Sequence, residues 1–292
     1  MKKKINELLE ILENRLEILL LIEIKKFLGL KQEEVIKLKE IKGSNHVYSF
    51  VVKKQKYVAK ILKENSIINW EQEKAAYNSL KPLNITDEVV YFENGIKISK
   101  YIKSKTLSCS EPDLIKSLDL IRKVHESGCS INYNYDIIGN MKAYIKICNK
   151  ESKELKELLS FMDKIKKIQA LVNNLNIPTV LCHGDACAVS NFLRLSDESI
   201  KIIDWEQAGM ADPLLDIAIA VLHQGFEKVD PVWCLHQYLK RPPKKQEYFR
   251  LFSFLALNSF SLMAWCIYEN PDDYSYYLNS AKKYSELVLN YY

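Results

Sequence analysis

The spacing of hydrophobic residues along the chain changes twice, and each change predicts a different kind of element. Between residues 3 and 28, apolar side chains recur at helical spacing with glutamates between them, which predicts an amphipathic helix that ends at Gly29. Further on, short apolar runs typical of strands follow one another, at 35–38, 47–52, 57–62, 89–92 and 96–102. The tripeptide Glu93-Asn94-Gly95 predicts a tight turn between the last two runs.

From Pro112 onward the helical period dominates again. Helices are predicted at 114–124, at 151–172, from Asp212-Pro213 onward with Asp212 as the N-cap, at 231–243 and at 246–268. His125 ends the first of these and is expected to bond backbone groups there rather than to do chemistry. Two short apolar runs, at 180–182 and 200–203, indicate strands between the helices. The pattern predicts an α+β fold, β-rich at its N-terminal end and helical at its C-terminal end.

A polar stretch after residue 102 separates the two parts. We expect an N-terminal amphipathic helix at 1–30, a β-rich N-lobe at 31–103 and a helical C-lobe at 104–292. The N-terminal helix is expected to pack on a neighbouring element, since apolar stripes usually belong to the core. Pairing with a second copy of the chain in a homodimer is the alternative.

Composition narrows the class of protein. The chain has 292 residues, 48% of them hydrophobic, which is enough for a sizeable core. Its formal net charge of +5, from 42 basic and 37 acidic residues, comes without the basic tract that nucleic-acid binding needs. The seven cysteines form no Cys-x-x-Cys pair, so we expect reduced thiols in a cytoplasmic protein. The apolar run from Ile18 to Ile22 is too short to cross a membrane, and no membrane partner is expected.

Three polar residues near the ends of the predicted strands form the candidate site. Asp185 follows the run at 180–182, Asp204 follows the run at 200–203, and Asn191 lies between them. Phosphoryl transfer to a hydroxyl needs such a set: one carboxylate orients the acceptor O–H, and an amide with a second carboxylate holds Mg²⁺. For any one of these residues alone, a loop or capping role is the alternative.

Lys60 lies within an otherwise apolar strand, Tyr-Val-Ala-Lys-Ile-Leu, where a charge is either turned to water or held for a partner. The predicted helix after it offers Glu73 as that partner, with Glu71 as the alternative. Such an ion pair fixes a lysine against nucleotide phosphates. The turn Gly43-Ser44-Asn45 could lay backbone N–H groups over a phosphate, and a plain hairpin turn is the alternative there.

Around these residues the chain resembles the protein-kinase-like small-molecule kinases, the superfamily of aminoglycoside phosphotransferases and choline/ethanolamine kinases. Within it, the sequence is most similar to bacterial choline kinases. The likeness spans about residues 33–288. It rests on His183-Gly184-Asp185 with Asn191-Phe192-Leu193, Ile203-Asp204-Trp205-Glu206, Ala208-Gly209-Met210, and Asp212-Pro213 with Asp216-Ile217-Ala218.

The resemblance implies a two-lobed protein-kinase-like fold and assigns roles by position. By this resemblance, Asp185 would be the catalytic base, and Asn191 and Asp204 would be the Mg²⁺ ligands. Lys60 and Glu73 become the pair that anchors the phosphates of ATP.

The same resemblance implies roles for residues around this centre. Ser99, Tyr101 and Ile102 would belong to the hinge that holds the adenine ring. Asp216 would brace the catalytic loop, and His183 would support that loop rather than do chemistry.

Two positions depart from the family's pattern. The loop from Asp185 to Asn191 is one residue longer than usual and lacks the usual basic or proline helper. The Trp-x-x-Trp pair of choline kinases corresponds here to Leu262-Met263-Ala264-Trp265, so one aromatic ring is replaced by leucine. The first departure bears on catalysis and the second on the acceptor.

A cationic acceptor is expected to lie among aromatic and acidic side chains. Trp265 remains from the family's cage, with Tyr268 one turn later. Other side chains can complete the pocket: Trp205, Glu206, Trp233 and Tyr238. Each aromatic face contributes ~0.5–2 kcal/mol to binding a quaternary ammonium, so the loss of one ring weakens a cage without abolishing it. The alternative is that Trp265 and Tyr268 belong to the core.

We therefore predict a small-molecule kinase that uses ATP and Mg²⁺ to phosphorylate a hydroxyl of a small cationic acceptor. Choline or a related amino alcohol is the first candidate for that acceptor. An aminoglycoside phosphotransferase is one alternative, and a non-catalytic pseudokinase that only binds its ligands is the other.

Overall fold

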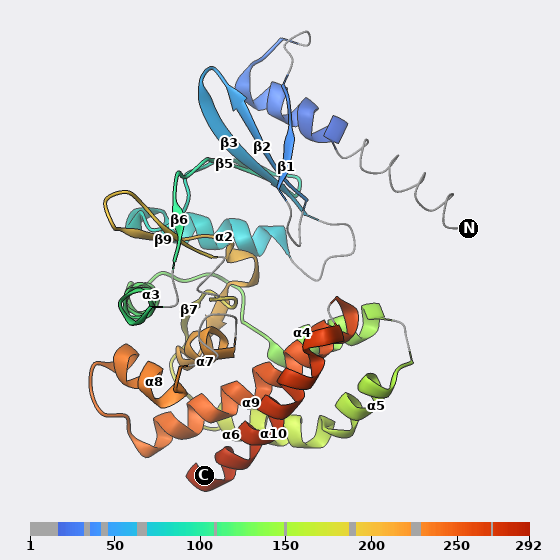
Figure 1. The fold of residues 1–292 in the computed structure, drawn as a ribbon, viewed down its shortest axis with the longest axis vertical. Coiled ribbons are helices and arrows are strands. Elements are labelled where there is room, and N and C mark those ends of the chain that lie inside the picture. The colour runs from blue at the N-terminus through green and yellow to red at the C-terminus, as the bar shows by residue number, and fades with distance from the viewer. Residues whose placement is uncertain are drawn as a thin grey trace. The chain divides into compact units, whose positions relative to one another are not determined.

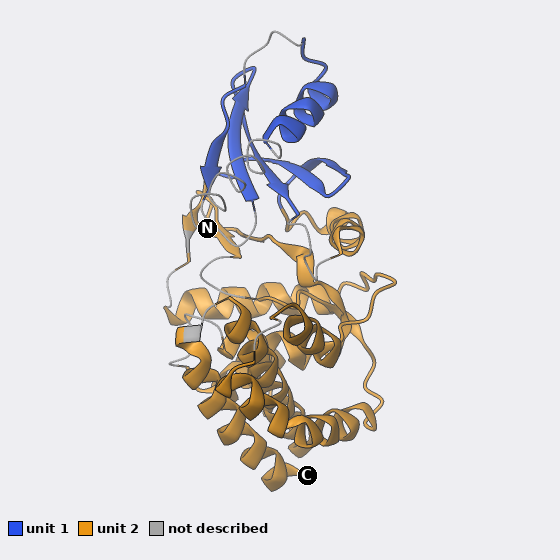
Figure 2. Cartoon of the chain, turned by 90° about the vertical axis from the view of Figure 1, so that its right-hand side faces the viewer, with its two compact units in different colours: residues 1–66, 87–102 blue, residues 67–86, 103–292 orange. Residues whose placement is uncertain are grey.

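The computed structural model describes residues 17–31, 36–41, 46–62, 69–107, 110–148, 151–186, 191–222, 229–269 and 271–292. Contacts divide the chain into two compact units (Figure 2): Met1–Ser66 with Asp87–Ile102, and Ile67–Thr86 with Lys103–Tyr292. The chain passes from unit 1 to unit 2 for the last time after Ile102, next to the expected lobe boundary. The segment Ile67–Thr86, which we expected in the first lobe, groups with the second unit.

Within the described residues, unit 1 is built on an antiparallel sheet with strand order β1-β2-β3-β5-β4. Its strands are β1 (Lys39–Ile41), β2 (His46–Val52), β3 (Gln55–Ile61), β4 (Val89–Glu93) and β5 (Ile96–Lys100). Asn94 and Gly95 both have positive φ, 53° and 72°, as a tight hairpin turn requires, so the predicted turn is confirmed. The prediction of a strand at 35–38 is wrong for the described residues 36–38, which have no regular structure. The turn expected at 43–45 lies outside the described residues.

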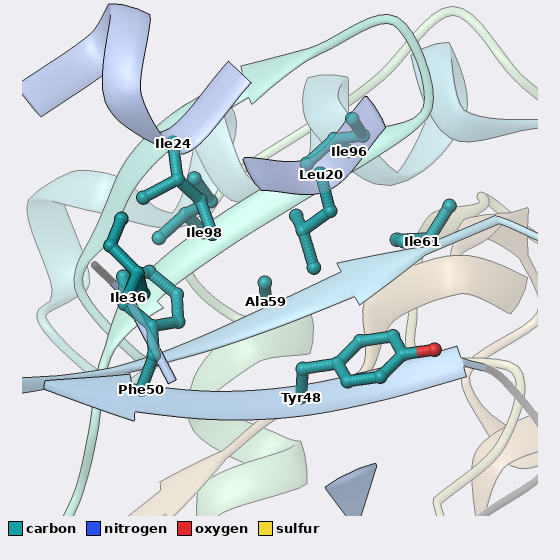
Figure 3. Close-up of a cluster of buried hydrophobic side chains, with 9 residues drawn as sticks. All are labelled: Leu20, Ile24, Ile36, Tyr48, Phe50, Ala59, Ile61, Ile96 and Ile98. Carbon is teal, nitrogen blue, oxygen red and sulfur yellow. The ribbon is translucent and has the colours of Figure 1, made fainter. Parts of the chain in front are cut away.

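The helix at residues 17–28 covers one face of this sheet and contributes to the core of unit 1 (Figure 3). Leu20 and Ile24 are fully buried and belong to one cluster with Ala59 and Ile98 from the middle of the sheet. The helix ends at Gly29 as predicted: Gly29 has φ 59°, and the N–H of residue 30 bonds the Lys25 carbonyl at 2.9 Å.

The buried side of this helix differs from the predicted stripe. That stripe included Leu19, which is 52% exposed, whereas Leu20 has no exposed surface. Residues 18–22 are all apolar, so spacing alone did not show which of them face the sheet. The rest of the stripe, at residues 5–16, lies outside the described residues.

Unit 2 contains the helical part of the chain and two small sheets. Its helices are α2 (Trp70–Leu80), α3 (Glu111–His125), α4 (Ile137–Cys148), α5 (Lys153–Ser160), α6 (Met162–Asn173), α7 (Leu214–Leu222), α8 (Pro231–Leu239), α9 (Lys245–Tyr268) and α10 (Tyr274–Tyr291). Short 3₁₀ turns are η1 (Lys81–Leu83), η2 (Trp205–Gln207) and η3 (Pro271–Asp273). Strands β6 (Lys105–Thr106), β8 (Phe192–Arg194) and β9 (Ile200–Ile202) form one sheet, and β7 (Val180–Cys182) pairs with β10 (Gly209–Ala211) in the other. The predicted α+β class is confirmed.

Helix α9 is the central element of the helical core (Figure 1), where it contacts α4, α7 and α10. Phe254, Leu255 and Phe260 are among its many buried residues. Among the described helices, α9 has the length and apolar composition of a membrane span, but 72% of its most apolar window is buried within the protein. Packing against the neighbouring helices therefore accounts for its hydrophobicity.

The single helix expected at 151–172 is wrong in one respect, because the chain forms two helices there. Phe161 separates α5 from α6, and its ring lies 5.3 Å from the ring of Phe260 on α9. Ser152 caps α5, since its Oγ accepts the N–H of Leu155 at 3.1 Å. Helix α4, just before this segment, was not predicted.

Helix α7 starts as predicted from its cap. Asp212 accepts the N–H of Leu214 through Oδ1 at 2.9 Å. The same carboxylate also accepts a hydrogen bond at 2.7 Å from Nε of Arg250, on α9. The cap is thereby joined to the central helix.

Candidate active site

The two small sheets of unit 2 carry the predicted catalytic residues at the ends of their strands. The chain leaves β7 at His183-Gly184-Asp185, enters β8 directly after Asn191 and leaves β9 at Ile203-Asp204. Strands β8 and β9 are antiparallel neighbours with Phe192 opposite Ile202. This pairing places residues 191 and 203 side by side.

Hydrogen bonds join the three strand ends directly. Asn191 donates from Nδ2 to the carboxylate of Asp185 at 3.0 Å and to the backbone carbonyl of Asp185 at 2.8 Å. The backbone carbonyl of Asn191 accepts the N–H of Ile203 at 2.9 Å, and Ile203 directly precedes Asp204. Four residues of the longer loop, 187–190, lie outside the described residues, but Asn191 still reaches Asp185.

His183 connects two of these ends and is only 1% exposed. Its Nδ1 accepts the N–H of Asp185 at 3.2 Å, so Nε2 carries the proton and donates to the carbonyl of Ile203 at 2.9 Å. The imidazole and the Trp205 ring contact each other edge to face, with 4.6 Å between ring centroids. These contacts agree with the supporting role expected for His183.

Asp216, in the first turn of α7, holds the backbone just before Asp185. Its carboxylate accepts the N–H of His183 at 2.7 Å and the N–H of Gly184 at 2.9 Å. Burial opposes the charged form of Asp216, but the hydrogen bond from His125, together with the neighbouring His183 and the Gly184 amide, outweighs it and lowers the pKa of the carboxyl. These contacts agree with the bracing role expected for Asp216.

Gly184 allows the chain to turn sharply beside Tyr135. Its φ is +77°, a conformation that side-chain-bearing residues rarely adopt. A Cβ at this position would lie 2.7 Å from Cε2 of Tyr135 and would also collide with the carbonyl of Gln207. Burial, and then the charge of Asp185, raises the pKa of the Tyr135 phenol.

Asp204 is held in an uncommon backbone conformation by contacts to α2. Its φ is 68°, in the left-handed region. Its N–H donates to the hydroxyl of Tyr77 at 3.3 Å, and Gln72 of the same helix donates to the carbonyl of Ala208. Helix α2 therefore fixes the backbone at both ends of the turn that carries Trp205 and Glu206.

Trp205 is a core residue, contrary to the expectation that its ring would contact an acceptor. It has no exposed surface, and its indole N–H donates to the carbonyl of Ile202 at 3.1 Å. The neighbouring Glu206 is half-buried. Because η2 turns the two side chains in different directions, only Glu206 remains available for the acceptor.

Tyr144 of α4 is a candidate acceptor-site residue that sequence reasoning missed. Its ring lies 6.3 Å from the ring of Tyr268, at the end of α9. Burial raises the pKa of the Tyr144 phenol. Three nearby carboxylates raise this pKa further, those of Glu206, Asp185 and Glu269. An aromatic and acidic environment therefore lies beside the proposed base.

The remaining aromatic candidates for the acceptor site differ in how far their side chains are exposed. Tyr268 is 43% exposed, and Trp265 is half-buried on the same helix. Tyr238 is buried and bonds His125, with 2.8 Å between its hydroxyl oxygen and Nδ1, so it is removed from the acceptor candidates. Trp233 is half-buried on α8.

Unit 1 carries the residues expected to bind nucleotide. Lys60 on β3 and Ser99 on β5 are buried, with 8% and 4% of their surface exposed. Tyr101 follows β5 and is 40% exposed, with Nζ of Lys56 3.7 Å from its ring centroid, and Ile102 is half-buried. Glu73 is 2% exposed on α2, which belongs to unit 2, so its pairing with Lys60 stays a prediction.

Lys97 is a second lysine that sequence reasoning missed. It lies directly opposite Lys60 in the β3–β5 ladder and is 7% exposed. Opposite residues in antiparallel strands share a face, and both lysines alternate with residues of the hydrophobic cluster, so they lie on the face away from the helix at 17–28. The signal was a lysine between two isoleucines, Ile96-Lys97-Ile98, the same kind of signal that identified Lys60.

The sequence pattern of choline/ethanolamine kinases matches residues 38–253. The chain belongs to the choline/ethanolamine kinase family. It is accordingly a small-molecule kinase, a phosphotransferase with an alcohol group as acceptor, as the sequence indicated.

Individual relatives agree with this assignment. The kinase is 26% identical to Protein LicA of Haemophilus influenzae over 190 residues, which cover 61% of this chain and 69% of that protein. Its fold is similar to that of choline kinase LicA from Streptococcus pneumoniae, with a TM-score of 0.74, 19% identity, and coverage of 94% of this chain and 99% of that one. A structure of LicA in complex with AMP gives a TM-score of 0.75 at 21% identity and covers 93% and 98% of the two chains. The protein-kinase-like fold is thereby confirmed.

Proposed function

We propose that this kinase transfers the γ-phosphoryl group of ATP to the hydroxyl of choline or a related amino alcohol. The proposal is carried by the hydrogen bond that joins Asp185 to Asn191, at the strand ends where this family's motif lies. The similar choline kinase LicA supports choline as the acceptor, and the AMP complex of LicA supports an adenine nucleotide as the donor.

Asp185 acts on the acceptor. Its carboxylate accepts a hydrogen bond from the acceptor hydroxyl and aims the oxygen at the γ-phosphorus. The new bond forms between that oxygen and phosphorus, while the bond from phosphorus to the β–γ bridging oxygen breaks and ADP leaves. The hydroxyl proton passes to Asp185. Asn191 holds the carboxylate in place by its hydrogen bond at 3.0 Å.

Asn191 and Asp204 would hold Mg²⁺. Their amide and carboxylate oxygens are the hard ligands that this ion takes together with phosphate oxygens, so the donor set fits. When bound, the ion supplies positive charge to the nucleotide phosphates. Lys60, in a buried strand position, would add a second positive charge with Glu73 as its partner, and Ser99 to Ile102 would contact the adenine ring.

The cationic end of the acceptor would lie beside Tyr144 and Tyr268. Aromatic faces attract a quaternary ammonium, which cannot donate hydrogen bonds. Glu206 and Glu269 add negative charge near the same ring. Trp265 contributes from the turn of α9 before Tyr268. An ammonium that carries N–H groups would bond these carboxylates directly, so ethanolamine is the closest competitor of choline.

The proposal is tested by ATP consumption with Mg²⁺ and one acceptor at a time: choline, ethanolamine, or a panel of aminoglycosides. Asp185→Asn serves as the inactive control, and Asp163→Asn, an exposed site on α6, serves as the matched control for losing one carboxylate. We expect turnover with choline that Asp185→Asn abolishes and Asp163→Asn leaves intact. Turnover with aminoglycosides alone would contradict the acceptor, and full activity of Asp185→Asn would contradict the base.

A further inference from the structure

A chain of buried hydrogen bonds continues from Asp216 away from the active site. Nε2 of His125 lies 3.1 Å from Oδ2 of Asp216, and Nδ1 of His125 lies 2.8 Å from the hydroxyl of Tyr238. His125 ends α3, Asp216 lies in the first turn of α7 and Tyr238 lies on α8, so three helices meet here. The expectation that His125 bonds backbone groups is wrong, because both of its ring nitrogens bond side chains.

The direction of these bonds follows from the chemistry of the partners. The Asp216 carboxylate can only accept hydrogen bonds, so Nε2 of His125 carries a proton and donates to it. In the neutral imidazole Nδ1 is then an acceptor, and the hydroxyl of Tyr238, which stays protonated because burial raises the pKa of its phenol, donates to it. Cys182 lies within the same cluster, and burial raises the pKa of its thiol well above the usual value, so it adds no charge.

The Asp216 carboxylate, at the end of this series of hydrogen bonds, accepts both from His125 and from the backbone amides before Asp185. Oδ2 of Asp216 accepts from His125 and also from the N–H of His183, while Oδ1 accepts from the N–H of Gly184. Turning the carboxylate to follow one donor would lengthen its bonds to the others. The orientation of His125 therefore determines where the backbone before Asp185 is held.

We propose that Tyr238 is a positioning residue for phosphoryl transfer, acting through His125 and Asp216 on the backbone of residues 183 and 184. The proposal rests on the proposed function, since it assigns the network to the base Asp185. Tyr238 keeps His125 in the tautomer with its proton on Nε2, and that proton keeps the Asp216 carboxylate turned toward the two amides. Neither residue contacts a substrate in this scheme.

The test compares Tyr238→Phe with Tyr274→Phe. Tyr274 is also buried in unit 2 and loses a comparable hydrogen bond, 2.9 Å from its hydroxyl to the carbonyl of Glu154, which is not part of the network. We expect Tyr238→Phe to lower kcat about tenfold, corresponding to about 1.4 kcal/mol, with KM for ATP and acceptor unchanged within about twofold. Tyr274→Phe should leave kcat unchanged. His125→Gln, which keeps a donor near the position of Nε2, should retain more activity than His125→Ala.

Hydrogen–deuterium exchange of the peptide that contains residues 183–185 provides a readout that needs no turnover. It should speed up in Tyr238→Phe and not in Tyr274→Phe. Unchanged exchange in Tyr238→Phe, or equal kcat values for the two variants, would overturn the proposal. If the wild-type protein phosphorylated no acceptor, the proposed function would fail, while the exchange comparison would still decide whether the network holds this backbone.

Discussion

Nδ2 of Asn191 lies 3.0 Å from the carboxylate of Asp185, across a loop that is one residue longer than the family's usual one. Asn191→Ala removes this hydrogen bond and one of the proposed Mg²⁺ ligands together. We expect kcat to fall by about 10²-fold and the half-saturating Mg²⁺ concentration to rise, since positioning and metal binding are both weakened. Initial rates across a Mg²⁺ titration measure both effects, and an unchanged Mg²⁺ dependence would remove Asn191 from the metal site.

Gly184→Ala should destabilise the fold more than another glycine substitution with the same backbone conformation. Gly128 has φ +76° and open space for 4 Å around the point where a Cβ would lie. Gly184 has φ +77°, with the backbone carbonyl of Gln207 nearest to that point and Cε2 of Tyr135 2.7 Å from it. We expect Gly128→Ala to lower the free energy of unfolding by about 1 kcal/mol, from backbone strain alone. Gly184→Ala should cost about 1–3 kcal/mol more, from overpacking.

Urea unfolding of the two glycine variants measures this difference. Equal losses in the two variants would show that both the Gln207 backbone and Tyr135 can move aside at no cost. Their packing against Gly184 would then place no constraint on the backbone before Asp185.

Asp216→Asn should change how stability depends on pH. The pKa of Asp216 is lowered in the folded protein, so its contribution is present above the ordinary value of 3.8 and is lost as the pH falls below it. We expect the variant to be less stable than the wild type by about 3 kcal/mol at pH 7, because an amide leaves buried donors unsatisfied. This difference should shrink below about pH 4. Urea unfolding between pH 3 and 7 measures it, and a constant difference would contradict the lowered pKa.

Tyr144→Leu should weaken binding of a cationic acceptor. Loss of one aromatic face costs ~0.5–2 kcal/mol, so KM for choline should rise by about 2- to 30-fold while KM for ATP stays unchanged. A neutral analogue of choline, with a quaternary carbon in place of the nitrogen, separates charge from shape. If the variant impaired choline and the analogue equally, Tyr144 would contribute packing rather than attraction to a cation.

Lys97→Met should raise KM for ATP, as Lys60→Met is expected to do. The two lysines are opposite each other on adjacent strands, and both are buried. Two charges at one place attract a polyphosphate more strongly than one does. Lys54→Met, at an exposed turn of the same sheet, is the control. A KM for ATP equal to that of the control would assign Lys97 to a structural role.

Local patterns were sufficient wherever neighbouring residues determine the conformation. The turn at Asn94-Gly95, the end of the first helix at Gly29 and the Asp212 cap of α7 were all predicted, since each depends on residues within about one turn of helix or hairpin. The resemblance likewise indicated that Asp216 braces the catalytic loop. Its contacts at 2.7 and 2.9 Å agree.

Local sequence patterns failed where the direction in which a side chain points decides its role. Trp205 and Glu206 are adjacent in sequence, but the backbone turn after Asp204 buries the tryptophan completely and leaves the glutamate half-buried. Leu19 and Leu20 are both leucines in one apolar run, and only the position of the sheet decides which one is buried.

The sequence by itself therefore determined the fold class, the family, and the carboxylate and amide side chains at the ends of the short strands. Only the tertiary structure showed that Tyr144 lies near Asp185, Glu206 and Glu269, and that Tyr238 is linked to the backbone of residues 183 and 184 through His125 and Asp216. The reason is physical. Motif residues are close in the chain and share one local geometry, whereas these partners come from separate helices that the packing of the hydrophobic core brings together.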